Sequence, residues 1–258
     1  MARIIAVANQ KGGVGKTTTA INLSAALASA GKKVLAIDID PQGNMTSGLG
    51  VDKDSVQYSV YELLIGECDA EDCITGTVCQ CLDLIPAHVN LAGAEVELLD
   101  AKRREYLLKD KLGAVESRYD YVIIDCPPAL SMLTINALTT AKGVLVPIQC
   151  EFYALEGLAQ LLYTINLVRD RLNGDLKVQG VVFTMYDSRT NLSADVVDNV
   201  RNNLDQHIYR TVIPRNVRLA EAPSHGLPIN LYDPRSTGAE GYRRLAEEII
   251  SEERKGGR

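Results

Sequence analysis

Residues 3–31 place an aliphatic run, a glycine-rich loop and a helical pattern directly one after another. The run RIIAVAN is followed by three glycines, Gly12, Gly13 and Gly15, and then by KTTTAINLSAALASAG. In that last segment the apolar residues recur at helical spacing, and Gly31 is a suitable residue to end a helix. A buried strand that turns through glycines straight into a helix is typical of α/β folds, so this stretch restricts the chain to that class.

The same alternation continues along the chain without a repeat, a low-complexity tract or a linker. Nearly all-apolar strand patterns occur at 33–40, 119–128, 144–150 and 178–186, and helical patterns at 131–143, 154–172, 191–204 and 238–253. Strands of this kind are buried on both faces, which indicates βαβ units. We expect residues 1–258 to form a single α/β domain, with a mostly parallel twisted sheet and helices on both faces.

Candidate functional residues follow three separate strand patterns. The glycine loop follows the first strand, Asp38 and Asp40 end the second, and Asp125 ends YVIID. Because the carboxyl ends of parallel strands meet at one edge of a sheet, we expect these residues to form one site.

The glycine loop predicts a binding site for a nucleoside triphosphate in a P-loop fold. Glycines let backbone N–H groups approach phosphate oxygens, and the following helix adds its positive end. Lys16 can then reach the β- and γ-phosphates, and the Thr17 hydroxyl can ligate Mg²⁺. Asp125 is expected on the magnesium side of the site. Asp38 stands two residues before Asp40, so we expect both side chains to lie on the same side of the strand, with Asp38 supporting the metal shell.

The loop departs from the usual Walker A pattern at one position. The first glycine would lie six residues before Lys16, where the chain has Gln10, and an additional lysine, Lys11, follows. KGGVGKTT with this extra lysine resembles the deviant Walker A motif of the ParA/MinD superfamily of ATPases. Together with VLAIDIDPQGN, YVIIDCPP, TMYDSRTNLS and VIPRNVRLAEAPSHGLPI, it resembles the Soj-like ParA chromosome-partitioning proteins along nearly the whole chain.

This resemblance implies a mechanism in which two subunits sandwich two ATP molecules. Lys11 would reach into the partner's site, Asp40 would orient the attacking water, and Lys16 would complete the catalytic set. The implied nucleotide contacts are Lys11, Gly12, Gly13, Val14, Gly15, Lys16, Thr17, Thr18, Pro214 and Asn216, and the implied metal residues are Thr17, Asp38 and Asp125. ATP and Mg²⁺ are the expected cofactors, and a ParB/Spo0J-type centromere-binding protein is the expected partner that stimulates hydrolysis.

Charge is distributed unevenly along the chain. Residues 1–168 hold 13 Lys and Arg against 20 Asp and Glu, whereas residues 169–258 hold 14 against 13. Such an asymmetry suggests a polyanionic partner, although most charged surfaces are simply solvated. By resemblance to Soj-like proteins, Arg189 and Arg218, with Arg215 beside them, would bind double-stranded DNA non-specifically. The protein would then be cytoplasmic and nucleoid-associated.

Three alternatives share the nucleotide site. A MinD-like membrane-surface switch needs a terminal basic amphipathic helix. In the segment EEIISEERKGGR, Ile249 and Ile250 fit a last helix packed on the body, and the short tail beyond them lacks Phe, Leu or Trp to insert in lipid, so we expect no membrane partner. An electron-transfer protein like the nitrogenase iron protein needs cysteines in specific loops, whereas we expect the six cysteines to be reduced and mostly buried, with Cys126 packed under its turn. An amidoligase would need additional substrate-binding segments.

Overall fold

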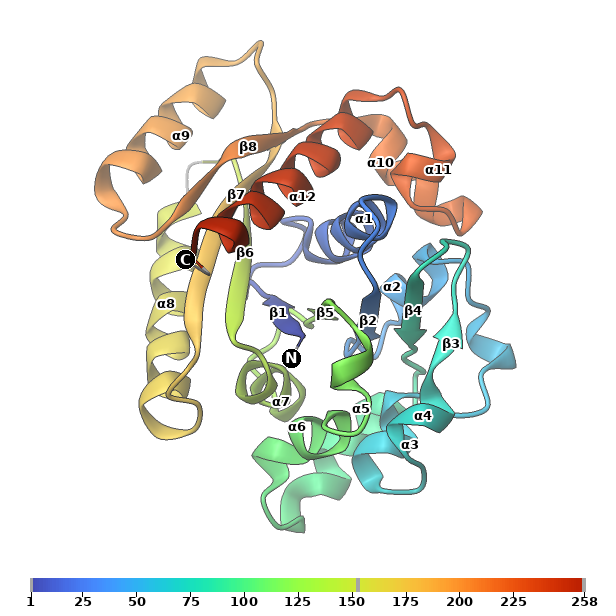
Figure 1. The fold of residues 1–258 in the computed structure, drawn as a ribbon. Helices are drawn as coiled ribbons and strands as arrows, with labels where there is room; N and C mark the ends of the chain where they lie inside the picture. Colours follow the sequence, from blue (N-terminus) through green and yellow to red (C-terminus); the bar gives the residue numbers. More distant parts are fainter. Residues whose placement is uncertain (1, 152–153, 257–258) are drawn as a thin grey trace.

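The computed structural model describes residues 2–151 and 154–256, and one eight-stranded sheet runs through them (Figure 1). The strand order is β3-β4-β2-β5-β1-β6-β7-β8, and every neighbouring pair is parallel except β3 and β4. The strands are β1 Arg3–Val7, β2 Val34–Asp38, β3 Thr75–Gly76, β4 Leu82–Ile85, β5 Tyr121–Asp125, β6 Gly143–Gln149, β7 Lys177–Tyr186 and β8 Ile208–Pro214.

Helices cover both faces of the sheet, and each layer encloses its own hydrophobic core. One layer contains α1 Lys16–Ser29, α2 Asn44–Gly48, α10 Val217–Glu221, α11 Ile229–Tyr232 and α12 Thr237–Gly256. The other contains α3 Val60–Ile65, α4 Ala70–Cys73, α5 Leu91–Glu97, α6 Leu107–Leu112, α7 Met132–Thr140, α8 Ala154–Arg171 and α9 Asn191–Asn203. Single 3₁₀ turns occur at η1 Lys53–Ser55, η2 Leu98–Asp100, η3 Arg104–Tyr106, η4 Glu116–Arg118 and η5 Ala222–His225.

The central strands are buried on both faces, which explains their nearly continuous apolar sequences. All residues of β2 and β5 are buried, and β1 is buried from Ile4 onward. β1 lies between β5 and β6 at the middle of the sheet. Strands β2 to β5 lie on one side of it and β6 to β8 on the other, so the strand order reverses direction at β1. In parallel sheets a ligand crevice lies at such a switch point, outside the carboxyl ends of the strands.

The elements predicted from aliphatic patterns are confirmed, with their ends shifted by a few residues. The strand patterns at 33–40 and 119–128 are shortened to β2 and β5, and the helix ending near Gly31 stops at Ser29. The sequence patterns did not identify β3, β4 and β8, nor the short helices between residues 52 and 118. These strands are short or have mixed polarity, and neither feature stands out in a periodicity argument.

The cysteines and the last helix also match expectation. All six cysteines are free, and four of them, Cys126 included, are buried. Tyr242, Leu245 and Ile249 of α12 lie in the core. None of the helices formed by the described residues combines the length and apolar composition that a membrane span requires.

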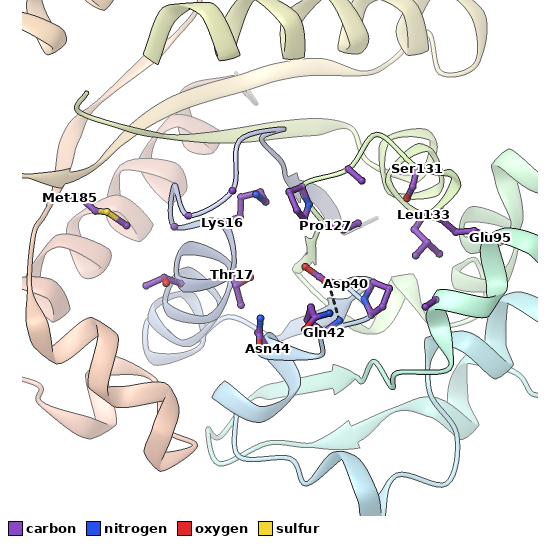
Figure 2. Close-up of a pocket in the computed structure, with 18 residues that line it drawn as sticks. Lys16, Thr17, Asp40, Gln42, Asn44, Glu95, Pro127, Ser131, Leu133 and Met185 are labelled. Atoms are coloured by element: carbon purple, nitrogen blue, oxygen red, sulfur yellow. Dashed lines mark hydrogen bonds between the residues drawn. The ribbon is translucent and has the colours of Figure 1, made fainter. Parts of the chain in front are cut away.

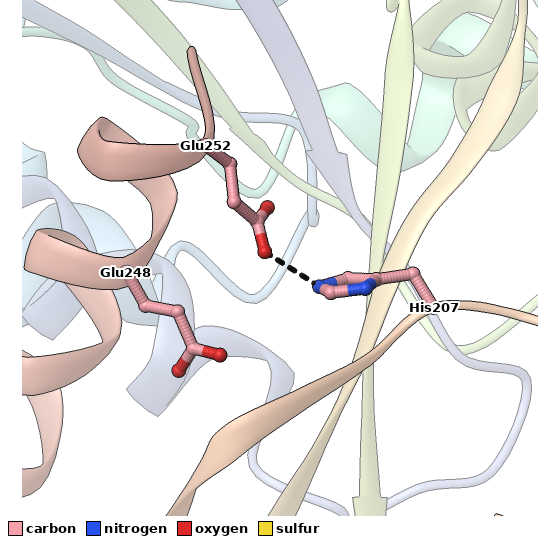
Figure 3. Close-up of side chains that lie close together, drawn as sticks. All are labelled: His207, Glu248 and Glu252. Atoms are coloured by element: carbon pink, nitrogen blue, oxygen red, sulfur yellow. Dashed lines mark ion pairs between the residues drawn. The ribbon is translucent and has the colours of Figure 1, made fainter. Parts of the chain in front are cut away.

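Polar contacts attach α12 to the edge strand β8. Figure 3 shows His207, which precedes β8, beside Glu248 and Glu252, one turn apart on α12. His207 Nε2 lies 2.8 Å from a Glu252 carboxylate oxygen. Both Glu248 oxygens already accept hydrogen bonds, from the backbone N–H groups of Arg210 and Thr211 and from the Thr211 hydroxyl. We therefore interpret this cluster as a structural clamp.

Candidate functional site: a phosphate-binding cleft at the carboxyl edge of the sheet

A cleft of about 690 Å³ opens at the carboxyl ends of β1, β2 and β5 (Figure 2). The glycine loop and the start of α1 form one wall, and the segment after β2, with Asp40, forms the floor. Segments after β5 and on α5, where Leu133 and Glu95 are labelled, close the other side. The sequence placed its three polar segments at one edge, and the structure brings them together there.

The glycine loop is shaped to expose backbone N–H groups. Gly13 and Gly15 have φ values of 74° and 87°, a left-handed conformation that favours glycine. Gly15 is the N-cap of α1, and among the described residues no side chain caps that helix. A Cβ at Gly12 or Gly13 would meet no atom of the part of the chain that the structure describes within 4 Å. The loop therefore leaves both donors and space for an anion.

Lys16 is nearly buried at the base of this loop, with 7% of its surface exposed. Its Nζ donates a 2.9 Å hydrogen bond to the Lys11 carbonyl oxygen. Burial lowers the pKa of Lys16, and the carboxylates of Asp125 and Asp40 partly oppose that shift. The ammonium group is thus held beside the loop, where a phosphate can replace the carbonyl as its partner.

Asp125 is a fully buried carboxylate whose two oxygens accept no hydrogen bond of ordinary geometry from the described residues. Burial raises its pKa well above the usual value, and the nearby Asp38 raises it further. The Thr17 hydroxyl lies close enough to lower that pKa slightly. An unsatisfied carboxylate beside a hydroxyl fits an oxygen-seeking cation such as Mg²⁺, which usually binds proteins through one or two oxygen ligands.

Asp38 and Asp40 differ in position, which corrects the expectation that both side chains lie on one side of a strand. Asp40 lines the cleft, and its Oδ1 accepts a 3.0 Å hydrogen bond from the Gln42 N–H (Figure 2). Asp38 ends β2 and is fully buried, with its carboxylate bonded to Asp40 and Thr46. Since the strand ends at Asp38, the two-residue alternation no longer applies at Asp40. Burial raises the pKa of Asp38 to about 6.

Lys11 lies outside the residues that line the cleft of its own chain. Its Nζ forms an ion pair with Glu151, which follows β6, and its backbone N–H donates to the Asn9 side chain at 3.0 Å. Both charged side chains of the pair are partly exposed, 38% for Lys11 and 35% for Glu151. The second lysine of the loop is therefore accessible from outside the subunit. Its predicted role in a partner's site remains a prediction.

A second cavity of about 360 Å³ adjoins the cleft and contains both residues predicted for the adenine end, Pro214 and Asn216. Gly15, Thr18 and Met185 line both spaces, which are therefore adjacent. The Asn216 amide is already engaged, since Oδ1 accepts from the Arg218 N–H and Nδ2 donates to Thr237.

Two further residues of the site take their roles from tertiary structure. Val14 is 2% exposed and its carbonyl accepts a hydrogen bond from the Thr184 hydroxyl, which leaves its backbone N–H to contact a nucleotide. Met185 lies in β7 with φ of 52°, a strained conformation for this residue type, and was not identified from the sequence. Strain of this kind is found preferentially at functional sites, but no local sequence signal reveals it.

The predicted DNA-binding arginines lie on the surface and differ in their partners. Arg189 makes two hydrogen bonds to the Asp187 carboxylate, at 2.9 and 2.7 Å, and lowers the pKa of that group. Arg218 pairs with Glu221 at 2.8 Å. Arg215 forms no ion pair with the described residues, although its charge also reaches Asp187.

The sheet order, the glycine loop and the strand-end aspartates together define a P-loop nucleotide-binding protein. A family model described as an AAA domain matches residues 2–178. Sporulation initiation inhibitor protein Soj of Bacillus subtilis is 58% identical over 97% of this chain and 99% of its own. Chromosome partitioning protein ParA of Caulobacter vibrioides is 52% identical over 98% and 95%. The chain belongs to the Soj/ParA family of chromosome-partitioning ATPases.

A solved structure confirms the expected α/β fold. Cobyrinic acid a,c-diamide synthase from Mycobacterium smegmatis, with bound ADP and magnesium, is 41% identical with a TM-score of 0.88, covering 99% of this chain and 97% of that one. Its name corresponds to the amidoligase alternative raised by the sequence. The ParA relative, named for chromosome partitioning, is more similar in sequence at 52%.

Proposed function

We propose that this ATPase is a DNA-partitioning switch in which Mg²⁺ and ATP assemble a sandwich dimer that binds DNA non-specifically. A ParB-type partner accelerates hydrolysis, and ADP returns the protein to monomers. In this proposal the protein acts in the cytoplasm, on the nucleoid.

The position of Lys11 is the observation that carries the proposal. Its ammonium group pairs with Glu151 outside the cleft, whereas Lys16 already serves the phosphates of its own subunit. The unobstructed space at Gly12 and Gly13 allows a second subunit to approach the loop. A cation delivered in trans stabilises the charge of phosphoryl transfer, so hydrolysis becomes dependent on dimerisation.

Within each site we assign Thr17 and Asp125 to magnesium. Asp40 orients the attacking water, because its carboxylate lines the cleft and lies close enough to Lys16 to act on the charge of that side chain. Asp38 acts on the metal only through its neighbours, since both of its oxygens are occupied by protein donors. Met185, Pro214 and Asn216 hold the base and ribose end.

Dimerisation supports DNA binding because it doubles the number of arginines on the proposed DNA-binding surface. Arg189, Arg215 and Arg218 are too few for tight binding by a monomer, and two of them are paired with carboxylates. A dimer presents twice as many arginines, and phosphate contacts steepen both affinity and salt dependence. A MinD-like membrane role is disfavoured because Tyr242, Leu245 and Ile249 of α12 are buried in the core.

The test is fluorescence anisotropy of a non-specific duplex titrated with protein in ADP, in ATP, and in ATP with Asp40→Ala, at two salt concentrations. We expect tight binding only with ATP, strengthened by Asp40→Ala and weakened by salt. Absence of binding in every state would refute the partition mechanism. Anionic lipid vesicles in the same assay test the membrane alternative.

A further inference from the structure

The loop between β2 and α2 is held by buried hydrogen bonds that converge on Asp38. One carboxylate oxygen, Oδ1, accepts from the Asp40 N–H at 3.2 Å. The other, Oδ2, accepts from both the N–H and the hydroxyl of Thr46, at 2.8 Å each. Asp38 and Thr46 are fully buried, and Asp40 is 9% exposed. The backbone position of Asp40 thus depends on the orientation of the Asp38 side chain.

Thr46 also connects this loop to the opposite wall of the cleft. Its hydroxyl oxygen accepts a 3.0 Å hydrogen bond from the Ala87 N–H. Ala87 lies between β4 and α5, and α5 contributes Ala92 and Glu95 to the cleft. A hydroxyl group can donate to Asp38 and accept from Ala87 at the same time, whereas an apolar side chain of the same shape can do neither.

Few other interactions hold Asp40 in place. Among the described residues, its carboxylate accepts only from the Gln42 N–H, and its carbonyl accepts from the Gly43 N–H at 2.9 Å. Both of these bonds lie within the same tight turn, so they move with it. The Ile39 N–H also donates to the Asp125 carbonyl on β5, and the Lys53 side chain donates to the Gln42 carbonyl. The contacts of Asp38 to Asp40 and Thr46 are the side-chain hydrogen bonds that join the Asp40 backbone to β2 and α2.

We propose that Thr46 is a positioning residue for hydrolysis: through Asp38 it fixes the backbone of Asp40, and through Ala87 it sets the distance between the two walls of the cleft. This inference rests on the proposed role of Asp40 with the attacking water. Thr46 is fully buried and is not among the residues that line the cleft, so it acts through Asp38 and Ala87. Small displacements of such a group reduce the rate of the chemical step much more than they reduce substrate binding.

The test compares Thr46→Val, which removes the hydroxyl at nearly constant shape, with Thr46→Ser, which keeps it. Thr139→Val is the matched control, because Thr139 is also fully buried and its hydroxyl donates to backbone carbonyls on α7 and before it, away from the cleft. Steady-state kcat and the Kd for ATP are measured for each variant, with thermal melting as a check of folding. Thr46→Ala replaces the valine variant if that one does not fold.

We expect Thr46→Val to lower kcat roughly tenfold or more, as expected when a buried charged acceptor loses a donor, with the Kd for ATP within about twofold of wild type. Thr46→Ser should stay within about threefold of wild-type kcat. Equal kcat in Thr46→Val and wild type would overturn the inference, as would equal losses in Thr46→Val and Thr139→Val. Asp40→Ala is measured alongside: if it retains full turnover, the proposed role of Asp40 fails instead.

Discussion

Asp125 provides a quantitative test, because a buried carboxylate with few hydrogen-bond donors should destabilise the ligand-free protein. Among the described residues neither oxygen accepts a hydrogen bond of ordinary geometry, and the side chain is fully buried, although the Thr17 hydroxyl and the Lys16 charge partly oppose the rise of its pKa. An unsatisfied buried polar group costs about 1–3 kcal/mol, and more when it is charged. Removing the charge with Asp125→Asn should therefore stabilise the apo protein. At about 2–4 °C per kcal/mol for a chain of this size, Tm should rise by roughly 2–12 °C.

Asp38→Asn is the matched control with the opposite expected sign. Asp38 is equally buried, but its oxygens accept three hydrogen bonds. In Asp38→Asn an amide NH₂ replaces one oxygen and faces hydrogen-bond donors, so at least one of these bonds is lost. The loss costs about 1–3 kcal/mol, and Tm should fall by an amount similar to the rise for Asp125→Asn. Both variants are melted in EDTA without nucleotide, by calorimetry. If both substitutions shift Tm in the same direction, the reasoning is wrong.

The pH dependence of the Asp125→Asn effect has a defined sign. Burial raises the pKa of Asp125 in the folded state, whereas in the unfolded chain it stays near about 3.9. Asp125 therefore stays protonated to a higher pH in the folded state than in the unfolded chain. As pH rises through the folded pKa, the wild-type protein loses free energy of unfolding. The advantage of Asp125→Asn should be largest at alkaline pH and shrink on acidification. With magnesium and ATP present, Tm should be higher for wild type than for Asp125→Asn, because only wild type gains the metal contact.

Three further substitutions test other parts of the account. Glu151→Gln releases Lys11 from a partly exposed ion pair worth about 0.2–1 kcal/mol, so the ATP concentration for half-dimerisation in sedimentation should fall by up to roughly fivefold; an increase would contradict this. At Gly12 an added Cβ meets no atom of the described residues within 4 Å, so Gly12→Val should leave Tm nearly unchanged while the ATP-dependent dimer is lost, and a retained dimer would argue against close subunit approach at this loop. Asp187→Asn frees Arg189 in both subunits of the dimer, so DNA affinity should rise and the salt slope of binding should steepen by about two, whereas an unchanged slope would remove Arg189 from the interface.

Those parts of the fold that depend on buried parallel strands could be predicted from the sequence. The runs around β1, β2 and β5 are apolar on both faces, and each is followed by polar residues. The sheet and the edge that carries the site could therefore be predicted. β8 has mixed burial because one face meets α12 and the other is partly exposed, and its sequence gave no clear period. β3 pairs through only two residues and carries no pattern at all.

The site was predictable in its members and less so in their arrangement. The glycine loop, Lys16, Thr17 and Asp125 could be identified because phosphate and magnesium require these groups at these positions. The different orientations of Asp38 and Asp40 depend on where β2 ends, and the Thr46 hydroxyl matters only because Ala87, far along the chain, approaches it. The α5 wall and the strained backbone at Met185 also arise from tertiary packing.

Mixing two inactive variants tests the central claim, that Lys11 acts on the partner's nucleotide. Lys11→Ala and Asp40→Ala should each hydrolyse ATP poorly. In a mixed dimer, the site of the Lys11→Ala subunit retains its own Asp40 and receives the intact Lys11 of the other subunit. At equal mixing half of the dimers are mixed and each has one complete site, so turnover should recover to roughly a quarter of wild type. Turnover no greater than the sum of the separate variants would contradict the account and place Lys11 in its own site.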